Sequence, residues 1–197
     1  MLNSLDIKNY RNLKELKIVS LGRVNLITGK NNTGKSALLE AIAIYATKGD
    51  LYLIYELLGE RGENYRWTEE NKNATESNIR ALSSMFTNRN VSFEKDDAIS
   101  IGSIENTSTG EEKSSKKSVS IRFVKFFDES QKDNQGGMIS RRIIALENKN
   151  DKQLANYRVA IQISAGGNTF VVPLDFTADR PSRLVRTGPG TNESLQF

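Results

Sequence analysis

The sequence predicts a mixed α/β (α+β) fold whose helices and strands are segregated along the chain. Residues 1–90 carry a glycine-rich loop and then stretches with the hydrophobic period of helices, whereas residues 91–178 show the two-residue alternation of half-buried strands. A parallel sheet would need helices between the later strands, so these are expected to form antiparallel meanders. Residues 179–197 are expected to be a loop that leads into a further strand. The whole is expected to be one structural domain.

The glycine-rich loop is the most specific feature of the chain. Residues 29–36 read Gly-Lys-Asn-Asn-Thr-Gly-Lys-Ser, a complete match to the phosphate-binding pattern GxxxxGK[ST]. Residues 23–28 alternate and are rich in β-formers, which predicts a strand entering the loop, and residues 36–46 predict a helix leaving it. This order is typical of a site for a nucleoside triphosphate with a divalent metal. The alternative is a glycine turn that caps an ordinary helix.

Each residue type in the loop suits a triphosphate. Backbone N–H groups of the loop and of the helix N-terminus converge on phosphate oxygens, and Gly29 and Gly34 permit that close approach of the backbone. Lys35 is expected to reach the β- and γ-phosphates as a point charge, and Ser36 to place its hydroxyl on Mg²⁺. The remaining candidate ligands contribute mainly backbone donors: Asn31, Asn32 and Thr33.

The helix after the loop is apolar on nearly every side. A helix of this kind is buried on more than one side. Residues 36–46 are therefore expected to pack between a sheet and other helices, as in an α/β nucleotide-binding domain.

Residues 2–44 also carry a combination of motifs. A strand with Leu5 and Ile7 leads into Asn9-Tyr10-Arg11, a second short strand follows, and the helix after the loop is leucine-rich and ends Ala-Ile. The combination resembles the start of ABC-type ATPases of the SMC/RecF and OLD (overcoming lysogenization defect) groups, P-loop ATPases grouped with the AAA family. The resemblance implies ATP and Mg²⁺ as cofactors and places Arg11 near the bound phosphates. The alternative is a solvated arginine at the end of a strand.

The resemblance also implies an architecture and partners. In such proteins an antiparallel β-subdomain packs beside the nucleotide core, and ATP is held between two heads that separate after hydrolysis. A second copy of the head is therefore the expected protein partner. The parent protein is expected to act in DNA maintenance or phage defence, where DNA is a partner that it could contact. One basic cluster suits phosphates of DNA or of ATP: Arg180, Arg183 and Arg186.

Composition excludes several other classes of site. The chain has no cysteine and no histidine, which rules out disulfides, thiolate metal sites and Ser-His catalysis. The net charge of +4 permits contact with nucleic acid without predicting it. No apolar run approaches the length of a membrane span, and the first residues show no signal-peptide pattern. A soluble, cytoplasmic protein without a membrane partner is expected.

The other elements follow from local patterns. Asp50 is placed to cap a second helix, and Thr75 or Ser77 to begin a third. Four alternating stretches predict strands: 98–104, 118–126, 157–163 and 169–174. The last two flank Ala165-Gly166-Gly167-Asn168, which predicts a hairpin. Two polar stretches predict loops: 107–117 and 128–138.

The groups that hydrolysis requires are not evident. A second acidic metal ligand and a group that polarises water are needed. The nearest acidic pair, Asp128 and Glu129, follows a strand with Lys125 inside it, which is typical of a half-exposed antiparallel strand. Asp175 follows a strand that contains Pro173 and is a weaker candidate. No catalytic residue is therefore assigned, and no serine-glycine signature motif occurs.

The chain is thus expected to be the N-terminal portion of a longer ATPase, an incomplete ABC-type head that binds Mg-ATP and hydrolyses it poorly alone. Two alternatives stay open. One is a nucleotide-dependent dimerisation or interaction module that never hydrolyses ATP. The other is a stand-alone P-loop NTPase that uses Asp128.

Overall fold

The computed structural model describes residues 2–63, 74–104, 118–132, 138–144, 157–175 and 185–186. Its helices are α1 (Lys35–Ala46), α2 (Leu51–Glu60) and α3 (Ala74–Ser83), with 3₁₀ turns η1 (Thr87–Arg89) and η2 (Lys95–Asp97). Its strands are β1 (Leu5–Tyr10), β2 (Leu13–Ile18), β3 (Ile99–Gly102), β4 (Ser118–Lys132), β5 (Met138–Ile144), β6 (Arg158–Ala165), β7 (Asn168–Pro173) and β8 (Val185–Arg186). None of the described helices is both long and apolar enough to span a membrane.

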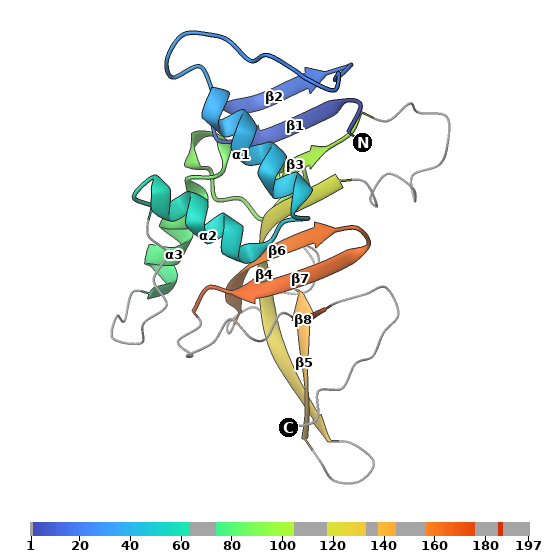
Figure 1. Cartoon of the computed structure of the whole chain (residues 1–197). Helices are drawn as coiled ribbons and strands as arrows, with labels where there is room; N and C mark the ends of the chain where they lie inside the picture. The colour runs from blue at the N-terminus through green and yellow to red at the C-terminus, as the bar shows by residue number, and fades with distance from the viewer. Residues whose placement is uncertain are drawn as a thin grey trace.

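Within the described residues, the strands form one antiparallel sheet in the order β2-β1-β3-β4-β6-β7-β8, and β5 pairs with the far part of β4. The two halves of the sequence share this sheet, because β1 pairs with β3 in the register Ile7↔Ile101. Helices α1 and α2 cross one face of it, while the β4–β5 ribbon extends away from them (Figure 1). The fold is therefore mixed α/β, as predicted.

The core lies between this face of the sheet and the helices. Alternate residues of β1 and β3 are fully buried: Leu5, Ile7, Ile99 and Ile101. Ile44 of α1 and Ile54 of α2 belong to the same cluster. Gly49, in the link between these helices, has a φ of 74°, and a Cβ there would lie 2.6 Å from Ile163 Cγ2 of β6. The link therefore passes so close to the sheet that a larger residue does not fit.

Several local predictions are confirmed. The helix after the glycine-rich loop is α1, and Asp50 caps α2 by accepting a hydrogen bond from the Leu53 N–H at 3.0 Å. The third helix, α3, begins one residue before Thr75. Strands β3, β4, β6 and β7 coincide with the four alternating stretches to within a few residues at their N-terminal ends, β3 being shorter and β4 longer than predicted, and residues 166–167 form the predicted hairpin turn.

Three predictions are wrong in whole or in part. Residues 23–28 form no strand, because no described strand pairs with them. The helix at residues 36–46 packs against the sheet and contacts α2, as predicted, but it is less buried than expected, since Leu39 is 60% exposed. In the stretch predicted as a loop at 128–138, residues 128–132 belong to β4 because they pair with β5, Met138 begins β5, and residues 133–137 lie outside the described residues. The predicted loop at 107–117 lies outside the described residues, as does most of the stretch 179–197.

Candidate functional site

The predicted phosphate loop, residues 29–36, runs directly into α1. Gly34 is the N-cap residue and has a left-handed conformation with φ 99°, which glycine adopts without steric cost. No side chain caps α1, and its first turn holds no acidic residue. The first N–H groups of a helix have no partner within it, and they carry the positive end of the helix dipole. The end of the loop therefore fits a phosphate group.

Lys35 folds back across the loop. Its ammonium donates to the carbonyl oxygens of Gly29 at 2.8 Å and Lys30 at 2.6 Å. The Thr33 hydroxyl donates to the same Lys30 oxygen at 2.9 Å. These bonds join the start of the loop to its end, so the loop closes around the Lys35 side chain. The other predicted ligands in the loop are exposed: Asn31, Asn32 and Ser36.

The turn between β1 and β2 lies against the end of the phosphate loop. A Cβ on Gly34 would lie 3.0 Å from both Asn12 Nδ2 and Leu13 Cδ2. Glycine is thus required at position 34 for two reasons: the left-handed backbone conformation, and this close contact, which leaves little room for a Cβ. The sequence predicted a role for Arg11 in this turn but not for Asn12. The contact of Asn12 with Gly34 forms only when the β1–β2 hairpin packs on α1.

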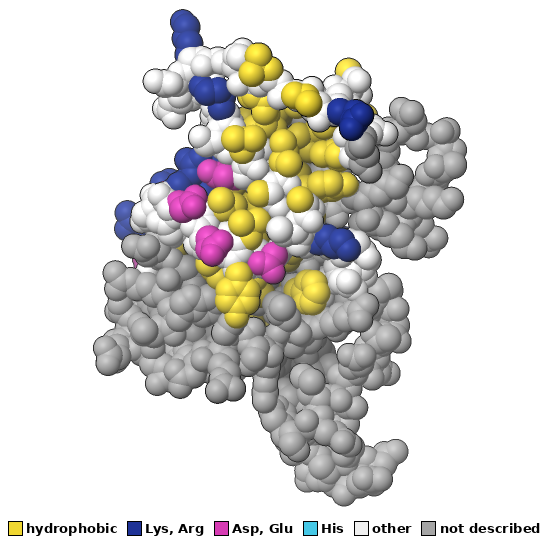
Figure 2. Space-filling model, in the orientation of Figure 1, with side chains coloured by type: hydrophobic (Ala, Val, Ile, Leu, Met, Phe, Trp, Pro, Cys, Tyr) yellow, Lys and Arg dark blue, Asp and Glu magenta, His cyan; other side chains and the backbone are white. Residues whose placement is uncertain are grey.

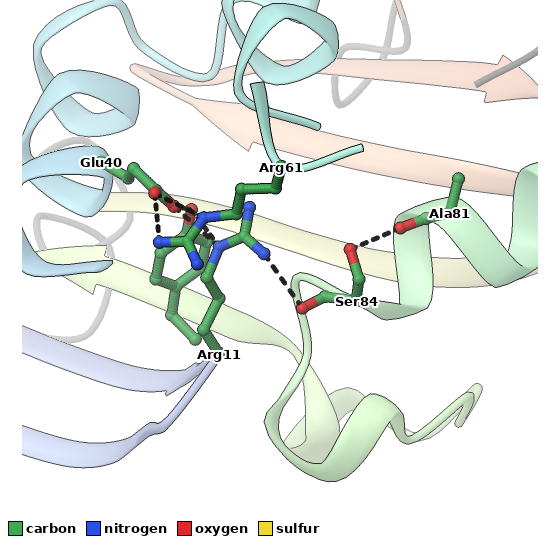
Figure 3. A network of polar contacts seen from close by, with 6 residues as sticks. Arg11, Glu40, Arg61, Ala81 and Ser84 are labelled. Carbon is green, nitrogen blue, oxygen red and sulfur yellow. Dashed lines mark hydrogen bonds and ion pairs between the residues drawn. The ribbon is translucent and has the colours of Figure 1, made fainter. Parts of the chain in front are cut away.

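Arg11 belongs to a network of polar contacts around Glu40 of α1 (Figure 3). Its Nε donates to Glu40 Oε2 at 2.7 Å, and the Tyr10 hydroxyl donates to the same oxygen at 2.9 Å. Arg61, which follows α2, donates to Glu40 Oε1 from Nε at 2.8 Å and from Nη2 at 2.5 Å. Arg11 Nη1 also reaches the Ser84 carbonyl oxygen at 3.4 Å. The network ties three other segments to α1.

The inner part of this network is shielded from water. The side chains of Arg11 and Glu40 are 9% and 12% exposed, and that of Arg61 is 38% exposed. The interpretation of Arg11 as a solvated arginine is therefore wrong. Arg11 Nη2 is buried and has no hydrogen-bond partner among the described residues. Burial also raises the pKa of the Tyr10 hydroxyl well above its ordinary value, so the hydroxyl remains a donor.

Residues 22–28 form an exposed connection between β2 and the loop. The Gly22 N–H donates to Asn25 Oδ1 at 2.9 Å, and Asn25 Nδ2 donates to the Gly22 carbonyl at 3.0 Å, which makes a local turn. Val24 is 91% exposed and Leu26 is 89% exposed. Figure 2 shows apolar side chains gathered over the region where α1 lies in Figure 1.

The acidic candidates lie elsewhere. Asp128 and Glu129 are in the part of β4 that pairs with β5, opposite Arg142 and Arg141. This ribbon extends away from α1 (Figure 1), so the fold does not bring the pair to the loop. Asp175 forms an ion pair with an arginine at the start of β6. Across the described parts of the chain, no three acidic, histidine or cysteine residues are grouped to hold a metal.

Comparison with known proteins finds relatives of this chain. The model of the AAA ATPase domain family matches residues 1–164. An uncharacterized protein of Methanocaldococcus jannaschii is 43% identical over 61 residues, which are 30% of this chain and 28% of that protein. An ATP/GTP phosphatase of Helicobacter pylori is 52% identical over 42 residues, 21% of this chain and 11% of that protein. The matches thus span less than a third of these relatives, and no solved structure matches significantly.

Proposed function

Because the chain belongs to the AAA ATPase domain family, whose model matches residues 1–164, we propose that it binds Mg-ATP through the loop at residues 29–36. One observation carries the proposal. The loop ends at left-handed Gly34, at an uncapped N-terminus of α1. Free backbone donors and the helix dipole there favour a phosphate group.

The loop residues have distinct roles in this proposal. The Lys35 ammonium, which bonds the carbonyl oxygens of Gly29 and Lys30, is the positive charge that faces the phosphates. The exposed Ser36 hydroxyl, in the first turn of α1, is the candidate ligand of Mg²⁺. When bound, Mg²⁺ neutralises charge between the phosphates. Three further residues supply backbone donors: Asn31, Asn32 and Thr33.

Arg11 is a further proposed phosphate ligand. Its guanidinium lies beside α1, and its Nη2 is buried with no hydrogen-bond partner among the described residues. A buried donor without an acceptor costs about 1–3 kcal/mol. A phosphate group that reached this donor would satisfy it, which supports a role of Arg11 in nucleotide binding.

The proposal extends to the kind of ATPase. The chain supplies the phosphate loop and an antiparallel β region of an ABC-type head of the SMC/RecF/OLD kind. Exposed apolar side chains support this: Val24, Leu26 and Leu39 are 91%, 89% and 60% exposed. Exposed apolar side chains that gather in a patch usually mark an interaction site. A further layer of polypeptide on residues 23–28 and α1 would cover this face and bring the acidic groups that hydrolysis needs.

Partners follow from the same proposal. ATP would be held between two copies of the head, and the larger protein would contact DNA in the cytoplasm, in DNA maintenance or in phage defence. The net charge of +4 is compatible with such contact.

Two other functions would use the same loop. A nucleotide-dependent dimerisation module would bind ATP and never hydrolyse it, whereas a stand-alone NTPase would use Asp128 as a second metal ligand. Asp128 lies in the β4–β5 ribbon, opposite Arg142 and away from α1. This position favours the dimerisation module over the stand-alone enzyme.

The test is Mg-ATP binding by isothermal titration calorimetry. The chain should bind Mg-ATP, and Lys35→Ala should weaken binding about 10- to 100-fold, since a hydrogen bond to a charged group contributes about 1.5–3 kcal/mol. Lys95→Ala, which removes the same charge from η2, should leave the affinity unchanged. Hydrolysis by the chain alone should be negligible. Absence of Mg-ATP binding would contradict the proposal, and rapid turnover that is lost in Asp128→Asn would favour the stand-alone enzyme.

A further inference from the structure

We propose that Glu40 is a positioning residue of the nucleotide site, which fixes the phosphate loop through the turn between β1 and β2. The inference rests on the proposed function and adds a residue that lies outside the loop motif. Glu40 is on α1, beyond the first turn, and its contacts lead back to the N-cap residue of the same helix, Gly34.

The first step is the bond between α1 and the turn. Glu40 Oε2 accepts from Arg11 Nε at 2.7 Å and from the Tyr10 hydroxyl at 2.9 Å. The Arg11 backbone N–H donates to the Met85 carbonyl at 2.7 Å, on the other side of the turn. Because Glu40 and Arg11 are largely buried, water does not replace these bonds easily. The carboxylate therefore sets the position of the turn relative to α1.

The second step is the contact between the turn and the loop. Asn12 follows Arg11 and lies where a Cβ on Gly34 would be only 3.0 Å away. The turn is thus held against α1 at two places, at Glu40 in the body of the helix and at the N-cap residue Gly34. If the turn moves outward, Gly34 loses the neighbour that packs against its backbone. The left-handed backbone of Gly34 is then held less firmly, and the backbone N–H donors of the phosphate loop are less well ordered.

The third step separates positioning from stability. The other oxygen of Glu40, Oε1, accepts two hydrogen bonds from Arg61. Arg61 follows α2, is 38% exposed and belongs to neither the turn nor the loop. The same carboxylate therefore has an inner arginine that leads to the loop and an outer arginine that joins two helices. Only loss of the inner pair should change nucleotide affinity.

The experiment measures the dissociation constant for Mg-ATP and the thermal midpoint of the full chain and four variants. Glu40→Gln keeps the side-chain volume and removes the charge, and it should weaken Mg-ATP binding about tenfold, by analogy with the losses that follow when a group that orients a metal-ligating residue is changed. Arg11→Met should weaken binding at least as much. Arg61→Met should change the affinity less than about twofold. The double variant Glu40→Gln/Arg11→Met should bind no more weakly than Arg11→Met, because Glu40 acts through Arg11.

Three results would overturn the proposal: unchanged affinity in Glu40→Gln, an equal loss in Arg61→Met, or additive losses in the double variant. If Glu40→Gln does not fold, Glu40→Asp gives the same test, because the shorter carboxylate keeps the charge but withdraws from the turn. No Mg-ATP binding by the unmodified chain would refute the proposed function itself. Normal binding by the unmodified chain and by Glu40→Gln would refute only the role of Glu40.

Discussion

Tyr10 is the largest fully buried side chain among the described residues, and its hydroxyl donates to Glu40. Burial is the main reason that its pKa is raised above the ordinary value of 10.0. Below pH 10 the folded and unfolded states both keep this proton. Above pH 10 the unfolded state loses it first, so Tyr10 makes the free energy of unfolding fall by up to about 1.4 kcal/mol per pH unit.

The variant Tyr10→Phe tests this predicted fall in the free energy of unfolding above pH 10. At pH 8 the variant should be less stable by about 0.5–1.5 kcal/mol, since one hydrogen bond to Glu40 is lost. Phenylalanine does not ionise, so only the unmodified chain becomes less stable through Tyr10 above pH 10. The difference in the free energy of unfolding between the two proteins should therefore shrink there. Urea unfolding at pH 8.0, 9.5 and 10.5 measures it. A difference that stays constant across this range would show that Tyr10 ionises equally easily in both states.

Residues of the site differ in how far sequence predicts them. The phosphate loop is predictable because backbone donors and one lysine must converge on one group, which fixes the spacing of Gly29, Gly34 and Lys35. The Glu40–Arg61 pair is not predictable in this way, because the two residues are 21 positions apart and meet only when α2 packs against α1. The sign in the sequence is Glu40 itself, the acidic residue in the apolar run of α1 that follows Ser36.

At the scale of elements, two glycines at the ends of α2 should respond in opposite ways to alanine. Gly49, which precedes the helix, has φ 74°, and a Cβ there would meet Ile163 Cγ2 at 2.6 Å and Val119 Cγ1 at 3.1 Å. Gly59 is within the helix, has no positive φ and has nothing within 4 Å of a Cβ. The first glycine is required by the fold, whereas the second only weakens the helix.

Gly49→Ala should therefore lower the free energy of unfolding by about 2–5 kcal/mol, from a left-handed backbone at about 1–2 and overpacking at about 1–3. Gly59→Ala should raise it by about 0.5–1 kcal/mol, because alanine is the better helix former. Chemical denaturation of both variants in parallel measures these changes. Equal effects of the two substitutions would show that the α1–α2 link does not lie against the sheet as described.

The elements that sequence predicts well are those whose pattern is satisfied locally. The β6–β7 hairpin is predictable because its turn and both strands are contiguous. Residues 23–28 have the composition of a strand, but a strand needs neighbours to pair with, and no described strand lies beside them. The reverse error occurs at 128–132, where polar residues extend β4 because β5 supplies backbone partners.

At the scale of the whole molecule, the outer side of α1 and the connection at residues 23–28 differ from the rest because they expose large apolar side chains. The helices cover one face of the sheet, but nothing described covers the outer side of α1 or the connection before the loop. Val24, Leu26 and Leu39 are consequently among the most exposed large apolar residues. Residues 23–28, which the sequence predicted as a strand, lie on this side, and no described strand pairs with them.

The double variant Val24→Asn/Leu26→Asn tests whether this side is free in the chain itself. Both side chains are about nine-tenths exposed, so their replacement should change the free energy of unfolding by less than about 0.5 kcal/mol. The unmodified chain should self-associate as its concentration rises, because exposed apolar strand-like segments pair or stick, and the double variant should do so less. Sedimentation velocity over a range of concentrations measures the association.

Tyr52→Asn is the matched control for this variant. Tyr52 is 65% exposed on α2, so its replacement also removes apolar surface, but away from residues 23–28. It should leave self-association unchanged. A loss of more than about 2 kcal/mol in the double variant would mean that Val24 and Leu26 are buried in a core, contrary to the structure. Equal association in all three proteins would mean that this face has no particular affinity for other polypeptide, which would remove the main support for its being covered in a larger ATPase.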